Sequence, residues 1–236
     1  SITAEDVGTN VKDMAYVRTE TSPVCGISRA LGGRGDPSPV TARGTYKGMK
    51  ACTEAALGTS SLRGLRVLVQ GLGNVGRFLC EFLHTEGAEL YVTDIHQEPI
   101  DEVTSRFGAT YVEPDKILDV EAEIFAPCAL GGILNAETIP KLKVKIVAGA
   151  ANNQLEKEKV HGPMLMEKDI LYAPDYVINA GGLINVANEI EGYNQNRALT
   201  QADGIYDILK NVLAVAKEKN IPTYEASNQI AELRIE

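Results

Sequence analysis

A short apolar run that leads into a glycine-rich loop and then a helical pattern constrains the fold of this chain most. Residues 65–70 of the stretch LRVLVQGLGNVGRFLCEFL are typical of a buried strand. Gly71, Gly73 and Gly76 follow as G-x-G-x-x-G, and residues 75–85 repeat apolar side chains at helical spacing. This order predicts a βα turn of a parallel sheet.

The same alternation of strand and helix continues along most of the chain, and glycines end several of the helices. It predicts an α/β fold with a doubly wound Rossmann parallel sheet, because right-handed crossovers place helices on both faces. Beyond residue 180 the pattern is helical. The expected strands are 65–70, 89–93, 109–112, 122–126, 144–148 and 170–173, and the expected helices are 41–57, 75–85, 98–107, 200–218 and 224–235.

The glycine loop has the composition of a dinucleotide-binding loop. Gly71 permits a tight turn, Gly73 lets the backbone approach a pyrophosphate, and Gly76 lets the helix lie close to the strand. Asn74 and Val75 open the helix, whose free N–H groups and positive dipole end attract phosphate. Two alternatives stay open from the loop alone: a structural turn without ligand, and an S-adenosylmethionine site.

Asp94 closes the second strand of the unit, in the segment YVTD. A carboxylate at this place accepts hydrogen bonds from both ribose hydroxyls of an adenosine and repels a 2′-phosphate. No arginine follows it, since the next residues are Ile95 and His96. We therefore expect NAD rather than NADP as the cofactor.

The segments after the later strands are expected to line this cofactor, because ligands of such sheets lie across the carboxyl ends of the strands. Cys128 and Ala129 follow one strand, and Ala150, Asn152 and Asn153 follow the next. Small residues leave room for a ring, and the amides offer donors and acceptors beside it. The paired asparagines also fit a turn at a helix start, and the segment NAGG after the last strand is a similar case.

The charge balance disfavours some partners. The chain has 236 residues and a net charge of −9, without a basic cluster, so we expect neither nucleic acid nor a membrane as partner. No apolar run is long enough to span a bilayer. The cysteines and histidines lack metal-ligand spacing, so we expect no metal, buried thiols in a reducing compartment and exposed imidazoles. These residues are Cys25, Cys52, Cys80, Cys128, His84, His96 and His161.

Several segments together resemble the glutamate/leucine/phenylalanine/valine dehydrogenase family. They are ITAEDVGT, GDPSPVTARG, VQGLGNVG, APCALGG, AGAANNQL and YAPDYVINAGGLINVANE, in family order and over nearly the whole chain. Within the family they are most similar to the branch of the leucine, valine and tryptophan dehydrogenases. The joint match is specific, whereas any one segment would be weaker.

The resemblance implies a role for further residues. It implies that Asp6 is the catalytic aspartate and that Thr41 lies at the nicotinamide end of the cofactor. Asn152 would contact both nicotinamide and substrate, and Leu183 and Val186 would line the pocket for the substrate side chain. Cys25 stands where the family has a threonine near that pocket.

The resemblance also implies how the chain is organised. Residues 1–40 would be a remnant of a substrate domain with its hinge, 41–199 the NAD-binding domain, and 200–236 helices that return toward the substrate domain. Family members carry a further N-terminal domain with two functional lysines, and no glycine pair here precedes a matching lysine. We therefore expect the chain to be the C-terminal two-thirds of such a protein.

The expected activity is the NAD-dependent, reversible oxidative deamination of an apolar L-amino acid, of the leucine, valine or isoleucine type, to the 2-oxo acid and ammonium. A cytoplasmic location and a homo-oligomer at full length are expected as well. Two alternatives stay open: an aromatic (tryptophan or phenylalanine) dehydrogenase of the same family, and a truncated NAD-binding module without activity.

Overall fold

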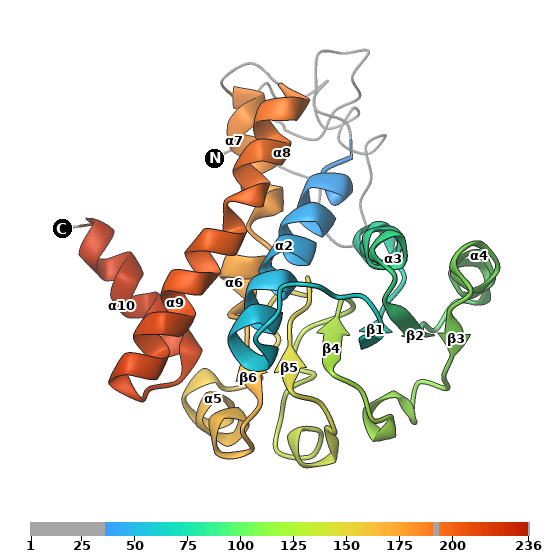
Figure 1. Ribbon diagram of the computed structural model, residues 1–236, viewed down its shortest axis with the longest axis horizontal. Coiled ribbons are helices and arrows are strands. Elements are labelled where there is room, and N and C mark those ends of the chain that lie inside the picture. The colour runs from blue at the N-terminus through green and yellow to red at the C-terminus, as the bar shows by residue number, and fades with distance from the viewer. Residues whose placement is uncertain (1–35, 191–193, 236) are drawn as a thin grey trace, which may run out of the picture.

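One parallel sheet organises the molecule. The computed structural model describes residues 36–190 and 194–235, and in these ranges the strands follow the order β3-β2-β1-β4-β5-β6 (Figure 1). The order reverses between β1 and β4, which confirms the predicted doubly wound Rossmann arrangement. The strands are β1 (Arg66–Gln70), β2 (Glu89–Thr93), β3 (Thr110–Tyr111), β4 (Ile124–Pro127), β5 (Ile146–Val147) and β6 (Leu171–Tyr172).

The sheet is buried on both faces because its strands alternate between two cores. Val67 and Val69 of β1 contact the core that contains α2, α3 and α4, whereas Leu68 belongs to the core on the α5 side. In β4, Ala126 belongs to the first of these cores and Phe125 to the second. This burial on both faces explains why the strands have apolar runs rather than an apolar–polar alternation.

Helices follow the strands as predicted, with three differences, one of which is the short helix α6 (Asp175–Ile178), which was not predicted. The predicted helix 200–218 is two helices, α8 and α9, that meet at Gly204. Helix α5 was not predicted, because Gly162 and Pro163 interrupt its apolar pattern. The helices are α2 (Ser38–Leu57), α3 (Asn74–Glu86), α4 (Gln97–Phe107), α5 (Glu158–Glu167), α6 (Asp175–Ile178), α7 (Gly181–Ile190), α8 (Gln195–Asp203), α9 (Ile205–Lys219) and α10 (Thr223–Ile235), with 3₁₀ turns at Ile117–Asp119 and Ile139–Lys141.

The predicted division of the chain at residues 40/41 and 199/200 stays a prediction. The second boundary lies inside α8, and α9 runs from there alongside α2 (Figure 1). Among the described residues, no helix has the combination of length and hydropathy that a bilayer crossing requires.

Helix α2 is tied to its neighbours by two carboxylates. Glu86, at the end of α3, accepts hydrogen bonds from the Tyr46 hydroxyl and Lys50 Nζ of α2, and also from the backbone N–H of Leu62 at 3.0 Å. Burial raises the pKa of Glu86, but these three donors outweigh burial and leave its pKa below the usual value. On the other side of α2, Glu54 accepts from the Tyr206 hydroxyl and from Lys210 of α9.

We predict that Glu86→Gln lowers the free energy of unfolding at pH 7 by about 1.5–3 kcal/mol, because hydrogen bonds to a charged group are lost. Since folding lowers the pKa of Glu86, its contribution is complete above the usual glutamate pKa and is lost as the pH falls through the lowered value. Urea unfolding at pH 7 and at about pH 3 measures the difference, which should be smaller at the lower pH.

The control is Glu89→Gln, which removes an exposed carboxylate from β2. It should leave the free energy of unfolding within about 0.5 kcal/mol of the parent at both pH values. An effect of Glu86→Gln no larger than that of this control would contradict the role assigned to Glu86.

Candidate functional site: a cleft at the carboxyl edge of the sheet

The glycine loop between β1 and α3 combines two positions closed to a side chain with one open position. A Cβ on Gly71, which has a φ of 99°, would lie 2.7 Å from the backbone nitrogen of Ala129. A Cβ on Gly76 would lie 2.0 Å from the carbonyl oxygen of Gly71. Gly73 is exposed, and nothing lies within 4 Å of a Cβ placed there.

The loop therefore has the shape that a pyrophosphate needs. The carbonyl of Gly73 already accepts the N–H of Arg77, whereas the start of α3 at Asn74 and Val75 faces open space next to Gly73. An anion at this place meets backbone N–H groups and the positive end of the helix dipole. The backbone geometry thus fits a phosphate-containing ligand.

Asp94 lies at the end of β2 and is fixed by backbone donors. Its Oδ2 accepts the N–H of Leu72 at 2.6 Å, and its Oδ1 accepts the N–H of His96 at 2.9 Å. Each carboxylate oxygen keeps a further acceptor site, and the side chain is half-buried. The carboxylate is consequently held beside the glycine loop and can still accept hydrogen bonds from hydroxyl groups.

A cleft of about 400 Å³ opens between Asp94 and the segment after β4. Gln70, Gly71 and Asp94 form one side, and Leu130 and Ile133 are among the residues of the other. Ile95 and Leu130 are apolar yet 85% and 71% exposed, so they offer flat apolar surface at the cleft. A planar ring beside a hydroxyl-binding carboxylate fits these walls.

Cys128 and Ala129 lie against the glycine loop. The N–H of Cys128 donates to the carbonyl of Gln70 at 2.7 Å, and Ala129 lines the cleft. Burial raises the pKa of the Cys128 thiol to about 11, and burial likewise raises the pKa of Cys52 to about 12. Both thiols are protonated at neutral pH and serve as small packing residues rather than as nucleophiles.

The other end of the edge is formed around Asn152, which follows β5. Asn179 Nδ2 donates to Asn152 Oδ1 at 2.6 Å and approaches the carbonyl of Ala150 at 3.4 Å. Asn152 is itself exposed, so its side-chain amide stays accessible to a ligand. The sequence predicts that Asn152 lines the cofactor, but it does not predict the hydrogen bond between Asn152 and Asn179. Asn179 belongs to the segment NAGG, which is a case similar to that of the paired asparagines.

Helix α7, which carries the predicted pocket residues, begins next to Thr41. A Cβ on Gly181 would lie 2.5 Å from the carbonyl oxygen of Val40, so α7 begins in close contact with α2 (Figure 1). Leu183 is 73% exposed and Val186 is half-buried on the same helix. The structure therefore brings Thr41 against the start of the helix that carries Leu183 and Val186.

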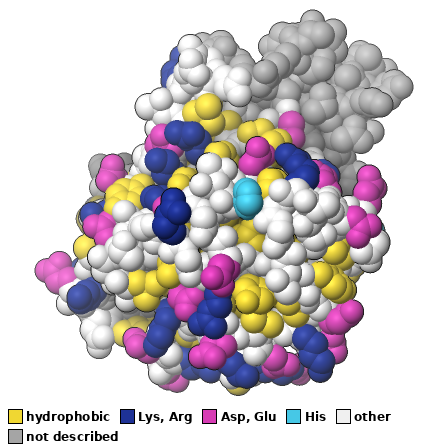
Figure 2. Space-filling view, turned by 45° about the vertical axis from the view of Figure 1, so that its right-hand side comes forward, with side chains coloured by type: hydrophobic (Ala, Val, Ile, Leu, Met, Phe, Trp, Pro, Cys, Tyr) yellow, Lys and Arg dark blue, Asp and Glu magenta, His cyan; other side chains and the backbone are white. Residues whose placement is uncertain are grey.

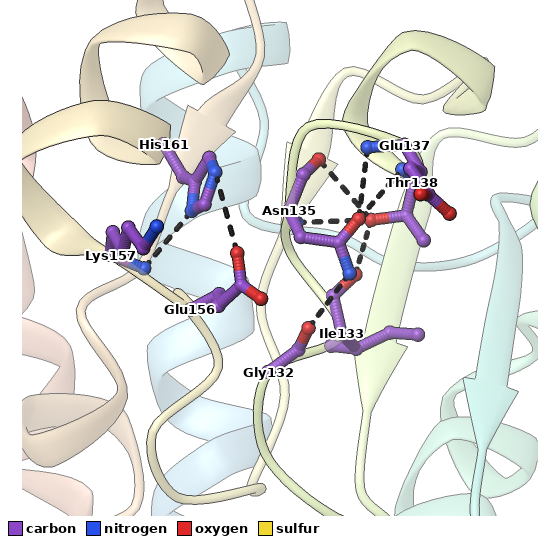
Figure 3. A network of polar contacts seen from close by, with 8 residues as sticks. All are labelled: Gly132, Ile133, Asn135, Glu137, Thr138, Glu156, Lys157 and His161. Atoms are coloured by element: carbon purple, nitrogen blue, oxygen red, sulfur yellow. Dashed lines mark hydrogen bonds and ion pairs between the residues drawn. The ribbon is translucent and has the colours of Figure 1, made fainter.

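Asp6 and Cys25 lie outside the described residues. The prediction that all histidines are exposed is wrong for His161, which is 2% exposed. Its Nδ1 accepts the N–H of Lys157 at 3.0 Å at the start of α5, and its Nε2 lies 3.8 Å from Glu156 (Figure 3). This buried imidazole holds a helix start, and the contact could not be read from its polar neighbours in the sequence.

The rest of the surface offers weaker candidates. Residues 36–190 and 194–235 contain no cluster of His, Cys, Asp and Glu suited to a metal ion. A hollow of about 500 Å³ between α5 and α9 is lined by none of the predicted site residues. On the face drawn in Figure 2, Lys and Arg side chains are interspersed with Asp and Glu and form no continuous basic field.

Comparison with known proteins agrees with the geometry. Residues 90–235 match the glutamate/leucine/phenylalanine/valine dehydrogenase family. The chain belongs to this family. A leucine dehydrogenase of Thermoactinomyces intermedius, a member of the glutamate/leucine/phenylalanine/valine dehydrogenases, is 58% identical over 235 residues, which cover 100% of this chain and 64% of that protein. The chain thus spans less than two thirds of the length of this relative.

Solved structures of related dehydrogenases have the same fold. The L-tryptophan dehydrogenase of Nostoc punctiforme superposes with a TM-score of 0.87 at 47% identity, covering 99% of this chain and 67% of the other. The hetero-hexameric glutamate dehydrogenase of Thermus thermophilus has a TM-score of 0.75 at 22% identity, covering 96% and 61%. The first confirms the fold within the family, and the second shows the fold alone.

The glycine loop leads to a prediction about stability. Gly76→Ala should lower the free energy of unfolding by about 1–3 kcal/mol, because the new methyl group overlaps the Gly71 carbonyl and forces α3 to shift. Gly73→Ala is the matched control and should stay within about 0.5–1 kcal/mol, since its methyl group meets open space at a φ of −63°. Thermal unfolding of both variants tests this, and equal melting temperatures would contradict the close approach.

Proposed function

We propose that this chain is the cofactor-binding part of an NAD-dependent L-amino-acid dehydrogenase acting on apolar substrates. The reaction converts an amino acid, NAD and water to the 2-oxo acid, ammonium, NADH and a proton. The observation that carries the proposal is that the glycine loop, Asp94 and the α7 start lie at the same carboxyl edge of the sheet. This is the edge at which doubly wound sheets bind their ligands.

NAD would lie across the point where the strand order reverses. The residues proposed to hold it are Gly71, Gly73, Asn74, Val75 and Gly76 at the pyrophosphate, Asp94 at the ribose hydroxyls, Cys128 and Ala129 along the cleft, and Thr41, Ala150 and Asn152 at the nicotinamide end. When bound, NAD accepts a hydride from the substrate Cα. The chain supplies the rigid loop and the amide donor of Asn152.

The substrate side chain would meet Leu183 and Val186. The large exposed fraction of Leu183, on a helix that contacts α2 and α8, supports this because its side chain is accessible to a substrate. Asp6 is proposed to hold and return the protons that pass to and from the substrate amine and attacking water. Cys25 is proposed to lie near the same pocket.

The oligomeric state and the cellular location of the protein are predictions. A homo-oligomer at full length is a prediction that sedimentation of the longest form encoded by the gene would test. A cytoplasmic location likewise stays a prediction.

The choice of cofactor is the first test. The parent chain should bind NAD at least about tenfold more tightly than NADP, because a 2′-phosphate beside the Asp94 carboxylate loses hydrogen bonds and gains repulsion. Asp94→Ala should weaken the binding of NAD and reduce the difference in affinity between NAD and NADP. Calorimetric titration of both cofactors measures this, with Asp101→Asn as a control that changes an exposed carboxylate on α4. Equal affinity of the parent for both cofactors would refute the role of Asp94.

The substrate class is the second test. A panel of L-amino acids, assayed by NADH formation with the longest form of the protein, should show oxidation of leucine, valine and isoleucine, with glutamate rejected. An apolar wall rejects a charged side chain strongly and separates apolar ones by only about 1–3 kcal/mol per methylene. Leu183→Ala should lower kcat/KM for leucine by about tenfold or more.

Each alternative has its own outcome in this assay. Glutamate as the best substrate would refute the pocket assignment. Tryptophan or phenylalanine as the best substrate would favour the aromatic alternative, which the similarity to the Nostoc punctiforme L-tryptophan dehydrogenase supports. NAD binding without turnover of any amino acid would favour the module without activity.

A further inference from the structure

Gln154 is a buried polar residue in the loop that follows β5. Its exposed fraction is 0%, whereas Asn152 and Asn153 beside it are exposed. The side-chain amide points back into its own loop: Nε2 donates to the carbonyl of Gly149 and to the carbonyl of Ala151, both at 2.9 Å. One NH₂ group therefore ties together the two carbonyls that flank Ala150.

The backbone of the same residue joins two further loops. Its N–H donates to Asp175 Oδ2 at 3.0 Å, after β6, and its carbonyl accepts the N–H of Leu134 at 2.9 Å, after β4. Asp175 Oδ1 also accepts the N–H of Tyr176 at 2.7 Å, within the first turn of α6. Gln154 thus connects the loops that follow β4, β5 and β6 at the edge where we place the cofactor.

Packing around this loop leaves little freedom. A Cβ on Gly149 would lie 2.2 Å from the carbonyl oxygen of Pro127, and one on Gly131 would lie 2.7 Å from that of Asn152. Asn153 has a φ of 52°, in the left-handed region. The segment after β4 is itself held by Asn135, whose side chain bonds the backbone of residues 132, 137 and 138 (Figure 3).

We propose that Gln154 is a positioning residue that sets the place and direction of the Asn152 amide toward the nicotinamide end of the cofactor. The inference rests on the proposed function. Gln154 acts through the loop: its two donors fix the carbonyls on either side of Ala150, and Asn179 then fixes Asn152 Oδ1 from the opposite side. In this proposal the Nδ2 group of exposed Asn152 is the donor offered to the ligand.

This role demands two donors on a neutral side chain of fixed length. Methionine has nearly the same length and no donor, so it leaves both carbonyls unbonded. Glutamate has the same shape, and its ionised form repels both carbonyls, whereas its protonated form restores one donor. The two substitutions separate loss of the hydrogen bonds from loss of volume.

The test compares NADH with ADP-ribose, which lacks the nicotinamide ring. Gln154→Met should weaken NADH binding to the chain by about tenfold and leave ADP-ribose within about twofold, because only the nicotinamide end depends on Asn152. Gln97→Met is the matched control on exposed α4 and should change neither affinity. An equal loss of affinity for NADH and ADP-ribose, or no loss of affinity for either, would overturn the proposal.

A pH series supplies a readout that a general loss of stability would not produce. Gln154→Glu should bind NADH weakly at pH 8 and recover toward the parent affinity as the pH falls and the carboxyl group is protonated, while the parent affinity changes little. A variant affinity that stays parallel to the parent over the whole range would contradict the positioning role.

Two measurements keep the inference separate from the proposed function. If the parent chain binds neither NADH nor ADP-ribose, the proposed function fails, whatever the variants do. If thermal unfolding shows that Gln154→Met does not fold, Asp175→Asn weakens the second tether from a half-buried position and should again reduce NADH binding more than ADP-ribose binding. No selective loss in either Asp175→Asn or Gln154→Glu would overturn the inference.

Discussion

The contact between the first turn of α3 and the carbonyl of Gly71 governs the rest of this edge of the molecule. A side chain on Gly76 would lie 2.0 Å from that carbonyl oxygen, so the helix reaches its position only with glycine there. The same contact places Leu72 where its N–H donates to Asp94. The loop, the helix start and the carboxylate that we propose for the ribose are therefore one connected unit rather than three independent parts.

A second set of contacts joins that unit to the opposite end of the edge. Gly71 lies against Ala129 after β4, and the segment after β4 bonds to the loop after β5 through Leu134 and Gln154. Asn179, after β6, donates a hydrogen bond to Asn152 in the loop after β5. Four strand ends are thereby coupled, and the proposed ribose and nicotinamide ends of the cofactor site share one scaffold. A shared scaffold of this kind suits hydride transfer, which requires a fixed distance between donor and acceptor.

The sequence predicted most of the sheet because strands that are buried on both faces have continuous apolar runs. Val67–Val69 and the neighbours of Phe125 are recognisable for this reason. The predicted runs 144–148 and 170–173 contain only the short strands β5 and β6, since apolar residues that flank a strand also fill the core. Periodicity alone likewise could not locate the break at Gly204, because buried apolar residues continue at helical spacing across it, with Ala198 and Ala202 before it and Ile205 and Leu209 after it.

The candidate site was predicted only where its chemistry depends on neighbours in the sequence. The glycine loop and Asp94 form within one βα unit, so their spacing was informative. The roles of Gln154 and Asn179 depend on loops that meet only in the folded chain, and His161 is buried by the same long-range packing. Asp6 and Cys25 lie outside the described residues and remain predictions from the family resemblance.

The most direct test of the central claim is to map backbone amide NMR shifts of the chain on addition of NAD. The account predicts large shifts for residues 71–76, 94–96 and 128–134 and smaller ones at 150–154, with none around the hollow between α5 and α9. Shifts confined to that hollow, or no shift at the glycine loop with NAD in excess, would contradict the placement of a dinucleotide at the carboxyl edge of the sheet.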